Sequence, residues 1–172
     1  MIAIRPVGPL PTSLVERLAH ELSRALGEPV GMGKGLPLPP VALNPRRNQH
    51  SAAELLYALR DIRRTGELAL GVTAVDLYVP GEDFVFGQAA PGIGAAVISL
   101  HRLGPKPPDE GLLLSRAVKE AAHEIGHFRG LGHCHHPSCI MSLSGTVEAT
   151  DRKGTGPCAT CRRKSLRRAV RP

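Results

Sequence analysis

The apolar positions in the first part of the chain predict alternating strands and helices. Residues 2–7 form a short apolar run that ends at Gly8-Pro9, which predicts a buried strand. The next segment predicts a helix that Thr12 or Ser13 caps and that ends at Gly27, because its apolar residues share one face: Leu14, Leu18, Leu22, Ala25 and Leu26. Residues 29–32 predict a second strand.

A loop and a second helix follow. Residues 33–47 are rich in Gly and Pro and show no apolar period, so we expect a loop there. From Ser51, which can cap a helix, to about Gly66 the apolar residues again recur at helical spacing: Leu55, Leu56, Leu59 and Ile62.

The middle of the chain has the composition of strands. Residues 68–79 are aliphatic and β-branched, and residues 84–86 and 94–100 are further strand candidates, separated by residues 87–92. A third helix is predicted from Asp109 or Ser115 to about Arg129, and the absence of any period beyond Gly130 predicts loops. Helices between the early strands require crossover connections, so the pattern predicts an α/β fold with a largely parallel or mixed sheet.

The composition fits one domain. The chain has 172 residues, of which 42% are hydrophobic, 22% charged and only 3% aromatic, so aliphatic side chains must build the core. No stretch reaches about 18 apolar residues, so we expect no membrane span. The N-terminal residues lack a basic region followed by an apolar one, so we expect no signal peptide and a cytoplasmic protein.

The net charge of +7 is concentrated near the C-terminus. Residues 151–172 carry eight Lys and Arg against one acid, Asp151, which leaves fourteen charges of each sign in residues 1–150. The basic tail contains no aromatic side chain that could stack on bases. We therefore expect a solvated segment and no nucleic-acid partner.

Residues 123–133 carry the strongest chemical signal. They read His123-Glu124-Ile-Gly-His127-Phe-Arg-Gly130-Leu-Gly-His133, or HExxHxxGxxH. His123 and His127 are four residues apart, so on a helix both side chains reach one metal ion. Glu124 would then lie beside the metal, where it can take a proton from a metal-bound water.

Gly130 predicts the end of this helix, because Gly tolerates the left-handed conformation that a sharp turn needs. The turn would bring His133 back as a third ligand. Three neutral imidazoles leave the fourth position of a zinc ion open, which is typical of a catalytic site. The alternative is a set of ordinary polar residues on a helix that ends at Gly130, but the added Gly and third His make such a coincidence rare.

Four cysteines follow the motif directly. In a chain without an export signal they favour metal over disulfides. Eighteen residues separate Cys139 from Cys158, a spacing at which two Cys pairs close one zinc site, and closed four-Cys sites are structural. Buried free thiols and disulfides are the alternatives. The adjacent basic residues could balance the charge of four thiolates: Arg162, Arg163 and Lys164.

The full pattern resembles the archaemetzincin family. It reads HExxHxxGxxHCx4CxM followed by a CxxC, and it covers residues 123–161. Met141 stands where metzincins have their Met-turn, although a lone Met is otherwise ordinary core filling. A looser likeness extends upstream, where residues 84–89 and 96–99 resemble the last two sheet strands of the family. Sixteen residues separate Met141 from Cys158, where about 17 would be expected.

The resemblance implies an α/β (α+β) metzincin-like zincin fold, with a twisted mixed sheet of about five strands, backing helices and an active-site helix. It implies an upper subdomain over residues 1–131 and a small zinc-tied subdomain over residues 132–172. It also implies the roles of the site residues. Glu124 would be the catalytic base and Met141 the floor beneath the catalytic metal. The catalytic zinc ligands would be His123, His127 and His133, and the structural zinc ligands Cys134, Cys139, Cys158 and Cys161. Ser142 and Leu143 stand where some metzincins carry a Tyr that assists the metal.

Three polar residues near these patterns receive no role. His135 and His136 follow Cys134, but each ligand set is complete without them, so we expect them to face solvent or to support a ligand. Asp76 is interpreted as a charge at the end of a strand.

The sequence therefore predicts a zinc metallopeptidase with two zinc ions, which acts as a monomer on a peptide or protein substrate. Residues 84–89 are expected to form an edge strand above the cleft, with which an extended peptide can pair. The alternative function is a non-catalytic zinc-binding module that contacts nucleic acid or a protein partner through the four-Cys knob and the basic tail. Glu124 argues against it, because a structural zinc site has no use for a carboxylate there.

Overall fold

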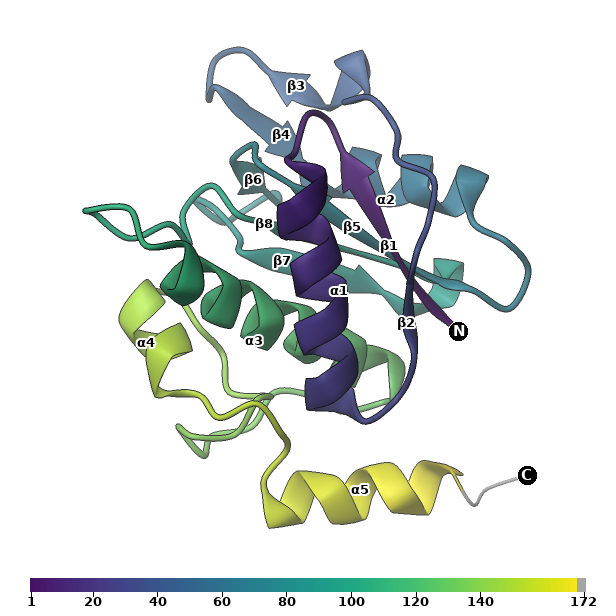
Figure 1. The fold of residues 1–172 in the computed structure, drawn as a ribbon, viewed down its shortest axis with the longest axis vertical. Coiled ribbons are helices and arrows are strands. Elements are labelled where there is room, and N and C mark those ends of the chain that lie inside the picture. Colours follow the sequence, from purple (N-terminus) through teal and green to yellow (C-terminus); the bar gives the residue numbers. More distant parts are fainter. Residues whose placement is uncertain (170–172) are drawn as a thin grey trace.

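A five-stranded mixed sheet forms the centre of the computed structural model, which describes residues 1–169 (Figure 1). Its strand order is β2-β1-β5-β8-β7. Four strands run parallel to one another: β1 (Ile2–Val7), β2 (Val30–Met32), β5 (Leu68–Thr73) and β8 (Ala95–Ser99). The edge strand β7 (Gly87–Ala90) is antiparallel to β8. The expectation of about five strands in a mixed sheet is confirmed.

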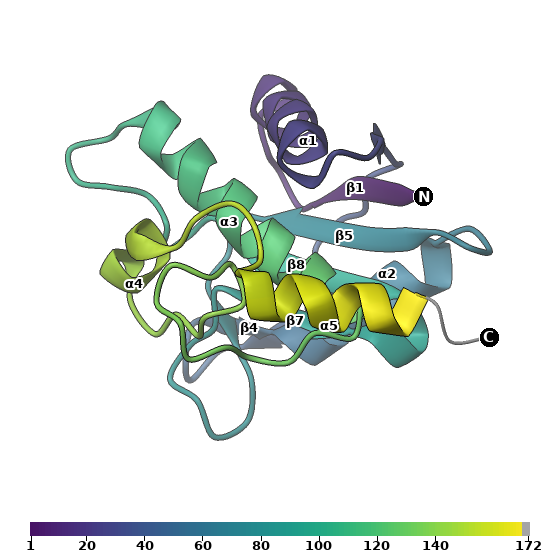
Figure 2. The same cartoon turned by 90° about the horizontal axis from the view of Figure 1, so that it is seen from below.

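Helices cover both faces of this sheet (Figures 1 and 2). Helices α1 (Thr12–Leu26) and α3 (Glu110–Phe128) pack on one face and against each other, and α2 (Ala52–Ile62) packs on the other. Successive side chains of a strand point to opposite faces, so Leu70 and Val72 of β5 join the core under α1 and α3, whereas Ala69 joins the core under α2. The sheet thus holds two aliphatic cores apart.

A small second sheet and two short helical turns lie in the connections. The sheet has the order β3 (Leu43–Asn44), β4 (Gln49–Ser51) and β6 (Leu77–Tyr78). The turns are 3-10 helices over Pro40–Ala42 and Pro91–Ile93. Both β3 and the first turn fall inside the segment that the sequence predicts as loop. The predicted strand over 68–79 is divided into β5 and β6.

The C-terminal part contains two helices, so the expectation of loops alone is wrong. Helix α4 (Val147–Arg152) begins after Thr146, whose Oγ1 accepts a hydrogen bond from the Ala149 N–H at 3.2 Å. Helix α5 (Ala159–Ala169) lies at the bottom of Figure 1, below α3. The expected basic tail runs through α5, and its last residues, 170–172, lie outside the described part of the chain.

Two boundaries differ from the sequence prediction in ways that matter for the site. The edge strand expected over residues 84–89 is shifted: residues 84–86 form only one isolated bridge, between Val85 and Leu77, and the strand is Gly87–Ala90. The position at the sheet edge is confirmed. Helix α1 starts directly after Pro11, and neither Thr12 nor Ser13 caps it. Within residues 1–169 no helix has both the length and the apolar character needed to cross a membrane.

Candidate functional site

A cleft of about 860 Å³ lies between α3, the edge strand β7 and the loop after α3. Its lining includes all three histidines of the HExxHxxGxxH motif and the motif carboxylate: His123, His127, His133 and Glu124. The lining also includes the segment from Glu82 to Ala89, together with Leu143 and Ser144. The motif therefore faces an open cleft.

Helix α3 brings the first two histidines together. Asp109 caps its start by accepting a hydrogen bond from the Leu112 N–H at 2.9 Å, and the helix continues without a break to Phe128. Residues four apart on a helix share a face, and the Nε2 atoms of His123 and His127 lie 3.2 Å apart. Of the two helix starts that the sequence allowed, Asp109 and Ser115, the structure therefore shows Asp109 as the capping residue.

Main-chain carbonyls orient both rings. His123 Nδ1 donates to Ile140 O at 2.8 Å, and His127 Nδ1 donates to Leu131 O at 2.9 Å. A proton on each Nδ1 leaves each Nε2 with a free lone pair that points toward the other. Acceptors of this kind commonly fix the tautomer and orientation of metal-binding histidines.

The third histidine joins through the predicted break of the helix. Helix α3 ends at Phe128, and Gly130 adopts φ 74°, in the left-handed region that favours Gly. The chain then reverses and places the His133 ring 5.4 Å from that of His123 and 5.1 Å from that of His127, between centroids. One ligand atom from each of the three residues lies within 4.8 Å of the others, so the group can hold a metal ion.

The donor geometry fits zinc. Two nitrogens that each lie about 2.0–2.1 Å from a tetrahedral zinc ion are roughly 3.3–3.4 Å apart, close to the 3.2 Å between the Nε2 atoms of His123 and His127. Burial, then the positive charge of Lys153, lowers the pKa of His123 to about 3, and burial also lowers the pKa of His133. Both rings are therefore neutral at pH 7, as metal ligation requires.

Glu124 is buried under the edge strand. Its side chain lies so close to Gly87 that a Cβ on this glycine would be 2.7 Å from Glu124 Oε1. Burial and the nearby charge of Glu120 raise the pKa of Glu124 to about 8, although Lys153 acts in the opposite direction. The carboxyl group thus readily holds a proton, which is useful for a group that must accept one and then return it.

Met141 is completely buried beneath the helix that bears the histidines. Its sulfur packs against Gly126, and there is no room for a Cβ at that position. Gly126 lies between His123 and His127 in the sequence, so Met141 lies under the stretch of helix that carries both of them.

A buried polar group behind the histidines has no counterpart in the sequence prediction. Glu120 accepts hydrogen bonds from Thr150 Oγ1 at 2.9 Å and from Lys153 Nζ at 3.3 Å. Lys153 Nζ also lies 3.5 Å from His123 Nδ1. Glu120 precedes Glu124 by one helical turn, so helical periodicity could have placed it on the site face. Lys153, thirty residues after His123, gave no such signal.

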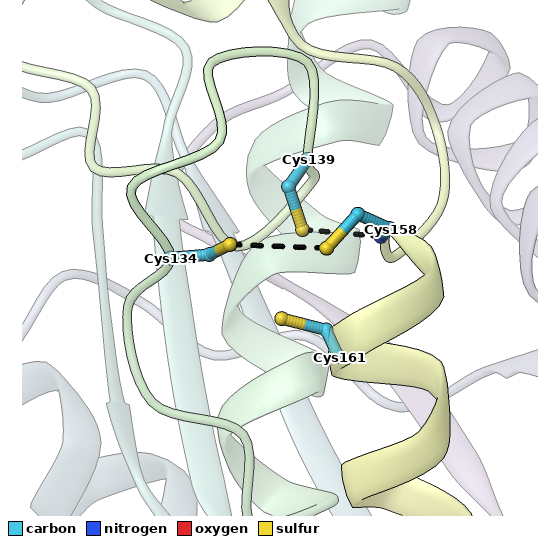
Figure 3. A group of neighbouring side chains, drawn as sticks. All are labelled: Cys134, Cys139, Cys158 and Cys161. Atoms are coloured by element: carbon cyan, nitrogen blue, oxygen red, sulfur yellow. Dashed lines mark hydrogen bonds between the residues drawn. The ribbon is translucent and has the colours of Figure 1, made fainter.

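The four cysteines form a second cluster, and all four are free thiols (Figure 3). Cys134 and Cys139 come from the loop after α3, Cys158 directly precedes α5, and Cys161 lies in its first turn. Their sulfur atoms lie within 4.8 Å of one another, so this group can also hold a metal ion. No cysteine belongs to the lining of the cleft.

The sulfur geometry fits zinc better than a disulfide. Cys134 Sγ and Cys158 Sγ are 3.9 Å apart, near the roughly 3.8 Å expected for two sulfurs 2.3 Å from a tetrahedral zinc ion. The Cys161 N–H at the start of α5 is the main cause that lowers the pKa of Cys158 to about 6. Burial raises the pKa of Cys161 to about 12 and also raises that of Cys139. One thiolate is therefore favoured before any metal binds.

Main-chain contacts join the two clusters. Cys134 directly follows His133, and its N–H donates to Met141 O at 2.8 Å. Cys139 directly precedes Ile140, whose carbonyl orients His123. Each cluster is thus held partly by the chain that forms the other. The charge of Lys153 also acts on Cys139, while the basic residues proposed for charge balance, Arg162 to Lys164, are exposed.

The residues without a predicted role divide into two cases. His135 and His136 are exposed, as expected. Asp76 is more than a strand-end charge, because it is only 8% exposed and accepts hydrogen bonds from Arg102 and Gln49. Asp76 directly precedes β6, as expected of a charge at the end of a strand, but nothing in the sequence indicated its burial or its partners.

Comparisons with known proteins agree with this geometry. Residues 39–168 match the model of Peptidase family M54. An archaemetzincin from Pyrococcus furiosus is 42% identical over 175 residues, which cover 95% of this chain and 91% of that relative. An archaemetzincin from Methanopyrus kandleri is 42% identical over 153 residues, which cover 89% of this chain and 86% of the relative.

Solved structures give the same result. The crystal structure of a zinc-dependent peptidase from Methanocorpusculum labreanum matches with a TM-score of 0.88 and 35% identity, over 96% of this chain and all of that one. The crystal structure of the Methanopyrus kandleri archaemetzincin matches with a TM-score of 0.86 and 39% identity, over 99% of this chain and 96% of that one. The family resemblance seen in the motif thus extends over nearly the whole fold, and the chain belongs to Peptidase family M54, the archaemetzincins.

Proposed function

We propose that this chain is a zinc-dependent peptidase with a catalytic zinc ion at the three histidines and a structural zinc ion at the four cysteines. The observation that carries the proposal is the position of a buried carboxyl group, that of Glu124, beside three convergent imidazoles in an open cleft. A closed structural site needs no such carboxylate. The four-Cys cluster, outside the cleft lining, suits the structural role.

His123, His127 and His133 would hold the zinc ion, which when bound would supply Lewis acidity toward the scissile carbonyl and toward an attacking water. The chain itself supplies the proton transfer. Glu124 accepts the proton of the attacking water and donates it to the leaving amine, so the same carboxyl group acts first as base and then as acid. Its burial under Gly87 keeps bulk water away from the proton that it carries.

The edge strand β7 is suited to hold an extended substrate. Phe86 O accepts a hydrogen bond from Ser99 N at 2.8 Å, and hydrogen-bonded pairs alternate along an antiparallel ladder. The main-chain groups of Gln88 and Ala90 therefore also turn toward β8, while those of Gly87 and Ala89 turn toward the open edge. A peptide that pairs with Gly87 would lie directly above Glu124.

The different roles of the two proposed zinc sites also suggest that the chain has two subdomains. Residues 1–131 would form the upper subdomain with the sheet and the active-site helix. Residues 132–172 would form the lower subdomain, tied together by the structural zinc. In support, residues 132–169 contribute no strand to either sheet and contain only two helices, α4 and α5.

The test is a digest of a peptide library by the wild-type chain and by Glu124→Gln, with zinc counted per chain. We expect cleavage by the wild type, almost none by the variant, and two zinc ions in each. Wild-type protein that carries both zinc ions but cleaves no peptide would contradict the proposal. Affinity for nucleic acid that falls with salt, without any cleavage, would favour the binding-module alternative.

A further inference from the structure

A network of four polar side chains lies next to the cleft, outside the two clusters. Asp76 and Gln49 are buried, with 8% and 5% exposure. Arg102 donates to both Asp76 oxygens, at 2.7 Å from Nε and 2.6 Å from Nη2, and Gln49 Nε2 donates to Asp76 Oδ2 at 2.9 Å. Arg47 Nε donates to Gln49 Oε1 at 2.7 Å. The four residues form one connected unit.

This network holds the main chain of the segment that leads into β7. Arg47 Nη2 donates to Glu82 O and to Asp83 O, both at 2.9 Å, and Gln49 Nε2 donates to Asp83 O at 2.8 Å. The Arg102 guanidinium lies 4.2 Å from the centroid of the Phe84 ring. We call residues 82–86 the rim, because all five line the cleft.

The main chain of the rim makes few other hydrogen bonds. No residue of the rim belongs to a strand of either sheet; Val85 N donates to Leu77 O at 3.0 Å in an isolated bridge, and Glu82 N donates to Val79 O at 3.2 Å. The Phe86 side chain is buried in the core and anchors the end of the rim. Ser99 N donates to Phe86 O at its end. The four-residue network therefore supplies most of the hydrogen bonds that fix the first half of the rim.

The charge at the centre of the network is maintained. Burial alone would raise the pKa of Asp76, but the hydrogen bonds from Arg102 and Gln49 and the charge of Arg102 outweigh burial and lower it. Asp76 is therefore a carboxylate at neutral pH. Charge-assisted and bidentate hydrogen bonds of this type are the stronger ones in proteins and restrict geometry as well.

The direction of the edge strand shows which part of a substrate meets the rim. Gly87 lies over Glu124, so the scissile bond should lie near Gly87. Antiparallel pairing is slightly the more stable arrangement. In an antiparallel substrate strand, residues that lie opposite the rim, which precedes Gly87, follow the scissile bond in the substrate.

We propose that Asp76, Gln49, Arg47 and Arg102 are positioning residues that hold the rim in place to bind the substrate residues on the C-terminal side of the scissile bond. This inference rests on the proposed peptidase function. It gives Asp76 and its partners a role in substrate binding at a distance from the reacting atoms. Their loss should therefore weaken binding of long substrates and leave the chemical step intact.

The test uses Arg47→Met, with Arg60→Met as a matched control. Arg47 is exposed, so its loss should not prevent folding, whereas Asp76→Asn changes a buried group and serves as the second variant. Arg60 on α2 is also exposed and also covers a tyrosine, Tyr57, at 5.1 Å, as Arg47 covers Tyr78 at 4.6 Å. Arg60 pairs with Asp61 and makes no contact with the rim.

Three peptides that share one cleavable core are compared: the core alone, the core extended on its C-terminal side, and the core extended on its N-terminal side. For Arg47→Met and Asp76→Asn we expect KM for the C-terminally extended peptide to rise about tenfold, with kcat within about twofold of wild type. The other two peptides should be unaffected, and Arg60→Met should behave as wild type. A loss confined to kcat, or a rise in KM for the N-terminally extended peptide, would overturn the proposal.

A second measurement separates this proposal from the peptidase function itself. Amide hydrogen exchange in residues 82–88 should become at least about tenfold faster in Arg47→Met, with no change over residues 123–133 and no change in Arg60→Met. If the wild type cleaves no peptide, the proposed function fails, but this exchange still tests the network. If amide exchange in the rim of Arg47→Met is unchanged, the network does not position the rim, whatever the peptidase activity is. If exchange is faster but KM is unchanged, the rim is not linked to substrate binding.

Discussion

The three-His cluster and the four-Cys cluster lie side by side but are built in different ways. The histidines span eleven residues, and two of them sit one turn apart on α3, a continuous helix. The cysteines span 28 residues of loop and the start of α5. The histidines open into the cleft, and His133 is exposed, whereas Cys139 and Cys161 are buried.

This difference indicates how each cluster is held. Helix hydrogen bonds and the carbonyls of Ile140 and Leu131 place His123 and His127 before any ion arrives. The Cys segments have much less regular structure, with only short contacts such as Gly154 N to Ser138 O at 2.9 Å. We infer that the three histidines are already in position before a metal ion binds. The segments that carry the four cysteines, in contrast, would need a bound metal ion to be ordered.

The sharpest way to break this comparison is to remove one thiol. Cys158→Ser should release the structural zinc and loosen residues 132–165, because a structural zinc site contributes about 10 kcal/mol or more at neutral pH. The histidines should suffer indirectly, since Cys134 adjoins His133 and Cys139 adjoins Ile140. Zinc per chain, the thermal midpoint and peptidase activity should all fall. The exposed neighbour His135→Ala is the control and should change none of them, and a variant that keeps two zinc ions would contradict the assignment.

Chelation should separate the two clusters in time. A moderate excess of 1,10-phenanthroline should remove the ion from the open three-His site first, because the thiolate site is closed. Activity should disappear with the first equivalent of zinc, while the thermal midpoint falls only with the second. If one step removes activity, both ions and the folded structure together, the clusters are not independent and the four-Cys assignment must be reopened.

Replacing the carboxylate should affect chemistry alone. Glu124→Gln should lower kcat by about 10²–10⁴-fold, the usual contribution of a positioned general acid or base. Zinc content should stay at two, and the thermal midpoint should hold or rise slightly, because the variant no longer buries an ionisable group. Glu120→Gln, one turn earlier, is the control. It should lower the thermal midpoint, because it leaves Lys153 buried without its partner charge. A loss below tenfold for Glu124→Gln would remove this residue from the mechanism.

Local sequence predicted the histidine cluster well because its geometry is local. The spacing of His123 and His127 on one helix, and the break at Gly130, follow from helical periodicity and the conformational freedom of Gly. The family resemblance carried the prediction further, to the cysteines and Met141. The core strands were also predictable, since β5 and β8 are buried aliphatic runs.

The features that the sequence prediction missed depend on distant contacts. The edge strand was expected over residues 84–89 but begins only at Gly87, because Gly-Gln-Ala-Ala has no strand pattern and its pairing with β8 makes it a strand. Helix α5 carries few apolar residues, so the sequence contained no apolar face from which this helix could be predicted. Lys153 was counted in the basic tail and Asp76 was interpreted as a strand-end charge, because their partners lie 33 and 26 residues away in the chain.

A smaller change tests how closely the edge strand fits Glu124, the proposed base. Gly87→Ala would place a Cβ 2.7 Å from Glu124 Oε1 and 3.0 Å from Val97 O, so Glu124 or the strand must move. We expect kcat to fall about tenfold to 10²-fold, as a displacement near 1 Å can cause, with zinc content and the four-Cys cluster unchanged. Gly92→Ala, where the added Cβ meets open space, is the control. If Gly87→Ala has the kcat of the wild type, the close contact between Gly87 and Glu124 does not position Glu124.

The smallest expected effect comes from an ion pair that joins α3 to α4 without any metal. Arg116 Nε and Nη2 donate to Asp151 Oδ1 and Oδ2 at 2.8 and 2.7 Å. The hydrogen bonds from Arg116 lower the pKa of Asp151, although burial opposes the shift. A lowered pKa means that the pair stabilises the folded state at pH values above the unfolded pKa near 4, and that this stabilisation is lost as pH falls through the folded pKa.

Asp151 is partly exposed, so solvent screening limits the contribution to about 1 kcal/mol or less. The free energy of unfolding of Asp151→Asn, measured in urea against wild type, should therefore be lower by a small amount that is constant from pH 7 to about pH 5. The difference should shrink below about pH 4, and added salt should reduce it. Glu16→Gln, which changes an exposed carboxylate on α1 that forms no ion pair within residues 1–169, is the control. A difference that already shrinks between pH 7 and pH 5 would track protonation of histidines or thiolates, and the link between α3 and α4 would then depend on the metal clusters after all.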